Sequence, residues 1–202
     1  MTLKPLLAAA SLAFAASSVF AAPIVGAPAP DFSLSDSNSR TETLSQYRGK
    51  TVVLEWNNPG CPFVQKHYSS GNIPKQQADA TKDGVVWLTI NSGAPGKQGH
   101  LDGAGTQALI AQYHAAPSAY LFDGDGKVGH LYGAKTTPHM YVIDGAGVLR
   151  YMGGIDSIAS TDKEDLAKAI QYVPQALAEL KAGKPVSVPV SQPYGCSVKY
   201  GS

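Results

Sequence analysis

The sequence predicts an α/β domain with a parallel core sheet and an antiparallel edge. Two short runs rich in β-branched and apolar residues, 51–56 and 85–90, have the pattern of buried strands, and each is followed by a predicted helix. A third strand is expected at 119–122. The segments 140–143 and 148–151 flank a glycine-containing turn and predict a hairpin. Strands that alternate with helices pair in parallel, and the hairpin adds the antiparallel edge.

The predicted helices are short. The first begins at Cys61-Pro62, because proline is favoured in the first turn of a helix, and we expect it to break near residues 69–71. A second helix is expected at 106–115. Residues 127–132 form a short amphipathic segment that is compatible with a further helical turn.

Three longer stretches complete the chain. Residues 22–50 are rich in Pro, Ser and Thr and predict extended structure. The strongest helical pattern covers 162–181, where apolar residues recur at helical spacing and Pro174 predicts a kink or a new turn. Gly183-Lys184-Pro185 ends that helix, and an extended C-terminal tail, residues 183–202, carries Cys196.

The first residues have the pattern of an export signal. Lys4 precedes an apolar run from Leu6 to Phe20, and small residues follow, so we expect cleavage after Ala21. The apolar run is shorter than the roughly 20 residues that span a bilayer, and no cysteine near the cleavage site offers a lipid anchor. We therefore expect a signal peptide at 1–21, a domain at 22–182 followed by the tail, no membrane anchor, and a periplasmic or secreted location.

Charge and cysteine content narrow the function. The chain has 202 residues, with 16 Lys and Arg against 15 Asp and Glu and no basic run, so nothing favours a nucleic-acid partner. Cys61 and Cys196 are the two cysteines, and an even count in an exported protein favours a disulfide. Because a domain of this size does not need a disulfide for stability, redox use of the pair is a second interpretation.

Cys61 stands where a thiol becomes reactive. It follows a buried strand and precedes a helix, and the free N–H groups and dipole at a helix N-terminus favour the thiolate. Lys66 and His67, further along the same helix, are expected to add positive potential. A buried, purely structural cysteine is the alternative.

Four segments carry a family pattern: Asn57–His67, Ala27–Leu34, Thr136–Asp144, and the tail from Gly183–Val186 to Pro193–Lys199. They resemble the redoxin group of the thioredoxin superfamily, which contains the alkyl hydroperoxide reductases, the thiol-specific antioxidants and peroxiredoxin-like proteins. The resemblance implies a thioredoxin-like fold, with a central mixed β-sheet flanked by helices and an extended C-terminal tail. It also implies an oxidoreductase in which Cys61 attacks and a cis Thr137-Pro138 bond shapes the groove where a partner docks; His139 then lines that groove.

Departures from the family pattern bear on the reaction. Val64 stands where thioredoxins have the second cysteine of Cys-x-x-Cys. Peroxiredoxins carry Pro and Thr or Ser where this chain has Leu54 and Asn58, and they carry an Arg at the position of Pro138. Such groups orient peroxide and stabilise the charge on the departing oxygen. Asn58 can donate a hydrogen bond, but the pattern favours thiol–disulfide exchange over efficient peroxide reduction.

Two further residues enter the predicted site. Cys196 can resolve a bond made by Cys61 only if the tail folds back over the groove; a structural Cys61–Cys196 bridge and two unpaired thiols are the alternatives. Glu55 interrupts an apolar strand close to Cys61. If buried, it is a candidate proton carrier like the buried glutamate of some exported thioredoxin-like reductases, but a solvent-facing position is the favoured interpretation.

We expect no cofactor and no metal, because the five histidines are scattered and Gln65 replaces the second cysteine of the copper-chaperone pattern. The leading hypothesis is an antioxidant thiol oxidoreductase that acts on protein thiols and disulfides, with a reductant that the sequence does not identify. A thiol peroxidase that uses Cys61 on small peroxides is one alternative. The other is a non-catalytic binding module with a structural disulfide.

Overall fold

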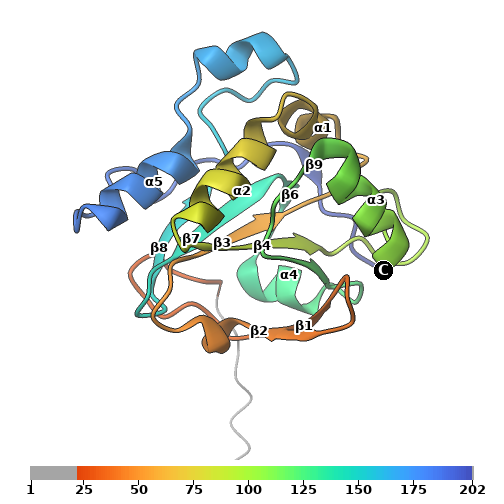
Figure 1. Cartoon of the computed structure of the whole chain (residues 1–202), viewed down its shortest axis with the longest axis horizontal. Coiled ribbons are helices and arrows are strands. Elements are labelled where there is room, and N and C mark those ends of the chain that lie inside the picture. Colours follow the sequence, from red (N-terminus) through yellow and green to blue (C-terminus); the bar gives the residue numbers. More distant parts are fainter. Residues whose placement is uncertain (1–21, 202) are drawn as a thin grey trace, which may run out of the picture.

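The computed structural model describes residues 22–201, so the predicted signal peptide lies outside the described residues. A seven-stranded sheet with the order β2-β1-β5-β4-β3-β7-β8 forms the centre of the domain (Figure 1). A separate two-stranded ladder joins β6 to β9. The strands are β1 Ser33–Asp36, β2 Thr41–Thr43, β3 Val52–Trp56, β4 Val86–Asn91, β5 Ala119–Phe122, β6 Thr136–Thr137, β7 His139–Ile143, β8 Leu149–Gly153 and β9 Cys196–Ser197.

The pairing confirms the predicted α/β sheet. Strand β4 pairs in parallel with both β3 and β5, while β7 runs antiparallel to β3 and β8. The extended segment 22–50 contributes more than expected, because β1 and β2 form a hairpin that adds antiparallel to β5. The fold is therefore a mixed sheet whose parallel centre is β3, β4 and β5.

Helices cover both faces of the sheet. Helices α1, α2 and α5 lie on one face and α4 on the other (Figure 1). Side chains alternate along β3, so Val53 joins the core cluster of the first face, whereas Leu54 and Trp56 join that of the second. A central strand covered on both sides has a near-continuous apolar run, as β3 does apart from Glu55. The helices are α1 Pro62–Ser69, α2 Asn72–Lys82, α3 Gly103–Tyr113, α4 Lys127–Tyr132 and α5 Tyr172–Lys181, with 3-10 helices η1 Leu44–Tyr47 and η2 Lys163–Ala167.

The prediction of a single helix at 162–181 is wrong. The segment divides into η2 and α5, and the residues between them pair with the chain that follows β8: the Ser157 N–H donates to the Ile170 carbonyl at 3.1 Å, and the Tyr172 N–H donates to the Ile155 carbonyl at 3.1 Å. Pro174 lies in the first turn of α5, where its missing N–H costs nothing. These tertiary contacts outweigh the local periodicity.

The break expected after Ser69 is confirmed, because α1 ends there and Gly71, with φ of 76°, leads into α2. Within residues 22–201 no helix has the length and apolar character needed to cross a membrane.

Candidate active site

Cys61 lies at the junction of β3 and α1. It is the N-cap residue of α1, with extended backbone angles, and Pro62 occupies the first helical position as predicted. The Cys61 N–H donates to the Asn58 carbonyl at 2.9 Å, which closes the turn before the helix. The side chain is fully buried, with a relative exposure of 0%. The thiol donates to the Thr137 carbonyl at 3.2 Å, which ties the sulfur to the loop before β7.

The C-terminal tail folds back over Cys61. Strand β9 pairs antiparallel with β6, so that Cys196 lies opposite Thr137, the residue whose carbonyl contacts the Cys61 thiol. The Thr137 hydroxyl also donates to the Cys196 carbonyl at 3.4 Å. Both cysteines are free thiols in this structure. Two residues far apart in the sequence are thus brought to one place by a two-residue ladder.

The two thiols differ in acidity. Burial opposes ionisation of Cys61, but hydrogen bonds from the Cys196 thiol and the Val64 N–H outweigh it and hold the pKa of Cys61 below its ordinary value. Burial, followed by the hydrogen bond and the charge of Cys61, raises the pKa of Cys196 to about 11. The pair therefore has one thiol suited to attack and one that keeps its proton.

The cis bond expected at Thr137-Pro138 is present. It joins β6 to β7, so Pro138 lies between the strand that pairs with the tail and the strand that pairs with β3. His139 follows it and is buried. Burial lowers the pKa of His139 to about 4, so this imidazole is neutral at neutral pH.

Asn58 shapes the turn before Cys61. Its side-chain oxygen accepts from the Gly60 N–H at 2.8 Å, and its amide donates to the Gln98 carbonyl at 3.3 Å. These contacts fix the loop on which Cys61 sits. A direct action of Asn58 on a substrate stays a prediction.

The expectation that Glu55 faces solvent is wrong, because the residue is fully buried. Its carboxylate accepts five hydrogen bonds. None of the five comes from a cysteine, so a role as proton carrier stays a prediction. The donors are Asn57 at 3.0 Å and Tyr68 at 2.8 Å to one oxygen, and Gln77 at 3.1 Å, Trp87 at 2.8 Å and Thr89 at 3.1 Å to the other.

Comparison with known proteins decides the family. Residues 25–152, which include β1 to β7, most of β8 and Cys61, match the AhpC/TSA family. The chain belongs to the AhpC/TSA family. The resemblance predicted from the four sequence segments is thereby confirmed.

Relatives of this AhpC/TSA protein agree with the expected class, an oxidoreductase of the thioredoxin superfamily. The thiol-disulfide oxidoreductase ResA of Geobacillus thermodenitrificans is 26% identical over 74% of this chain and 78% of its own length. The thiol:disulfide interchange protein DsbE of Allochromatium vinosum is 23% identical over 81% of each chain. A solved structure from Sinorhizobium meliloti, named only as a hypothetical protein, shares the fold with a TM-score of 0.72 at 23% identity, covering 90% of this chain and 97% of its own.

The sequence misassigns one neighbour of the AhpC/TSA site. The prediction that His67 adds positive potential is wrong, because the residue is buried. Burial, together with the charge of Lys66, lowers the pKa of His67 to about 4 and outweighs the opposing charge of Asp156. The imidazole is therefore neutral at neutral pH and serves as a hydrogen-bonding group. Its partners, Asp156 and Tyr194, come from the loop after β8 and from the tail. Asp156 stands in no motif, so no local signal could have found it.

Among residues 22–201, no three His, Cys, Asp or Glu side chains gather in an arrangement that could hold a metal ion.

Proposed function

We propose that this AhpC/TSA protein is an exported thiol–disulfide oxidoreductase in which Cys61 attacks and Cys196 resolves. The observation that carries the proposal is the pairing of β9 with β6, which sets the backbone of Cys196 against Thr137, the hydrogen-bond partner of the Cys61 thiol. The names of the relatives, ResA and DsbE, support the same reaction class. Export rests on the leader pattern at 1–21.

The first step of the proposed cycle uses the more acidic thiol. The Cys61 thiolate attacks one sulfur of a substrate disulfide, forms a mixed disulfide and releases the other substrate sulfur as a thiolate. The N-terminus of α1 and the hydrogen bonds from Val64 and Cys196 stabilise that thiolate before the attack. Pro138 and Asn58 hold the two loops that border Cys61.

The second step uses Cys196. Burial is the main cause of the raised pKa of Cys196, and the hydrogen bond and charge of Cys61 add to it. Once Cys61 is part of a mixed disulfide it carries no charge, so its contribution disappears and Cys196 ionises more easily. Its thiolate attacks the Cys61 sulfur and releases the second substrate thiol, leaving a Cys61–Cys196 disulfide. The two electrons have passed to the substrate, and an external dithiol must return them before the next turnover.

Trapping with single-cysteine variants tests this proposal. The Cys196→Ser variant is expected to accumulate a mixed disulfide between Cys61 and a disulfide-bonded model protein, because the resolving thiol is gone. The Cys61→Ser variant is the matched control and is expected to form none. The adducts are measured by non-reducing electrophoresis and mass spectrometry.

An adduct on Cys196 in the Cys61→Ser variant, or equal amounts of adduct in both variants, would contradict the assigned roles. Rapid oxidation of the Cys61 thiol by hydrogen peroxide, abolished in Cys61→Ser, would instead favour a peroxidase.

A further inference from the structure

The closed tail creates a conflict that the proposed cycle must resolve. Cys61 is fully buried, and Cys196 with its β9 neighbours lies over it. Thiol–disulfide exchange requires the attacking sulfur to approach the disulfide directly, which a covered sulfur cannot do with an external substrate. The tail must therefore leave for the first step and return for the second. Whatever holds the tail closed controls both steps.

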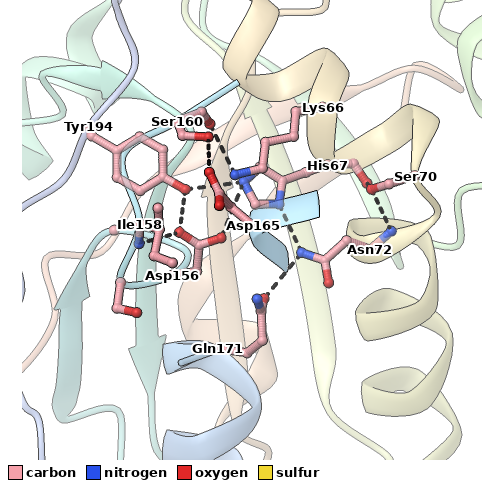
Figure 2. A network of polar contacts seen from close by, with 12 residues as sticks. Lys66, His67, Ser70, Asn72, Asp156, Ile158, Ser160, Asp165, Gln171 and Tyr194 are labelled. Carbon is pink, nitrogen blue, oxygen red and sulfur yellow. Dashed lines mark hydrogen bonds and ion pairs between the residues drawn. The ribbon is translucent and has the colours of Figure 1, made fainter. Parts of the chain in front are cut away.

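Besides the β6–β9 ladder, a tyrosine that lies just before Cys196 helps to hold the tail. Tyr194 lies two positions before Cys196, and its hydroxyl points toward the buried side chains of His67 and Asp156 (Figure 2). Its hydroxyl donates to an Asp156 carboxylate oxygen at 2.5 Å and lies 3.2 Å from the His67 Nε2 atom. Its ring packs edge-on against Phe63 of α1, with centroids 5.7 Å apart. Tyr194 thus joins the tail to the helix that begins at Cys61.

The hydrogen bonds in this cluster run in one direction. The Asn72 amide nitrogen lies 2.8 Å from His67 Nδ1 (Figure 2). With this nitrogen as the donor, Nδ1 accepts and Nε2 carries the proton of the neutral imidazole. His67 Nε2–H then points at the Tyr194 oxygen, and the Tyr194 hydroxyl gives its own proton to Asp156. The hydrogen bonds thus form a relay in which each donor points toward the next acceptor, from Asn72 to Asp156.

Asp156 depends on the tail for one of its two hydrogen-bond donors. The residue is buried, and one of its oxygens, 3.8 Å from His67 Nε2, has no hydrogen-bond partner among the described residues. The other oxygen accepts from Tyr194 and from the Ile158 N–H at 3.0 Å. A buried carboxylate that loses a donor is costly, so the cluster favours the seated tail.

We propose that Tyr194 is a positioning residue, a latch that closes the tail over Cys61 and sets Cys196 for resolution. The proposal rests on the assigned roles of the two cysteines. It predicts effects of opposite sign when the latch is weakened: Cys61 becomes more accessible to an external reagent, while resolution by Cys196 becomes slower. A substitution that merely destabilised the domain would not separate the two rates in this way.

The test is Tyr194→Phe, which removes only the hydroxyl and keeps the ring on Phe63. In the Cys196→Ser background, alkylation of Cys61 by iodoacetamide is expected to rise about tenfold, which corresponds to about 1.4 kcal/mol. With both cysteines present, glutathione disulfide forms a Cys61–glutathione mixed disulfide, and the release of its glutathione by Cys196 is expected to slow about tenfold. Tyr113→Phe on α3 is the matched control and is expected to change neither rate.

Unchanged alkylation with Tyr194→Phe, or a change of both rates in the same direction, would overturn the latch. The alkylation measurement needs no resolving cysteine, so it still judges the latch if Cys196 proves unable to release glutathione. Failure of Cys196 to release glutathione, with alkylation raised as expected, would count against the proposed function and not against the latch.

Discussion

Alanine at Gly195 is expected to keep Cys196 from reaching Cys61 and to slow closure of their disulfide by at least about 100-fold, the equivalent of about 2.7 kcal/mol. Gly195 has a φ of 126°, a conformation that side chains rarely adopt. A Cβ atom there would lie 2.1 Å from the Thr137 carbonyl oxygen and 2.8 Å from its carbon, so the tail crosses the loop before Pro138 in van der Waals contact with its backbone. Because the obstacle is backbone, it cannot rotate away as a flexible side chain would.

Gly183→Ala provides the matched control for this prediction. Gly183 also lies in the tail with a positive φ of 68°, but nothing lies within 4 Å of the point that a Cβ atom would occupy there, so only the backbone strain is shared. Closure is measured as the release of glutathione from the Cys61 mixed disulfide. A Gly195→Ala rate as close to wild type as that of Gly183→Ala would mean that Cys196 reaches Cys61 by another path.

Glu55→Leu is expected to lower the free energy of unfolding by more than about 4 kcal/mol, since five donors lose their acceptor and each buried unsatisfied group costs about 1–3 kcal/mol. The donors come from α1, α2, β4 and the turn after β3, so the carboxylate connects the elements that carry the active-site helix. Burial, and then the Glu55 charge, hold the pKa of Tyr68 well above its ordinary value, so this hydroxyl stays a donor. For a domain of this size the loss corresponds to a fall in Tm of about 10 °C or more.

The free energy of unfolding is measured by thermal and urea unfolding, and two further variants serve as comparisons for Glu55→Leu. Glu55→Gln keeps one acceptor oxygen and is expected to cost less than Glu55→Leu. Glu164→Leu, on the exposed surface of η2, is expected to stay within about 0.5 kcal/mol of wild type. Equal stability of Glu55→Leu and Glu164→Leu would show that the buried network contributes nothing to the fold.

Local pattern predicts the strands well because their signal is continuous in the sequence. The runs at 51–56 and 85–90 are apolar and β-branched, and they form β3 and β4. The periodicity at 162–181 misleads, since it describes a helix face but says nothing of the backbone pairing between Asp156 and Gln171 that interrupts it.

In the candidate site, too, local sequence predicts some features, while others depend on contacts between distant segments. The position of Cys61 before a proline and a helix is local, and the cis Pro138 bond follows from the family resemblance. The burial of Glu55 depends on donors from distant elements, among them Trp87. The neutral state of His67 follows from its burial, which outweighs the opposing charge of Asp156. No spacing within one segment encodes such contacts.

The most direct test of the Cys61–Cys196 pair is a redox titration of the wild-type chain in glutathione buffers, with the free thiols and the cross-linked peptides quantified by mass spectrometry. A redox pair predicts that Cys61 and Cys196 lose their thiols together in one reversible two-electron transition, and that a peptide linking them appears in proportion. Independent titration of the two thiols, each ending as a glutathione adduct with no linked peptide, would contradict the pairing.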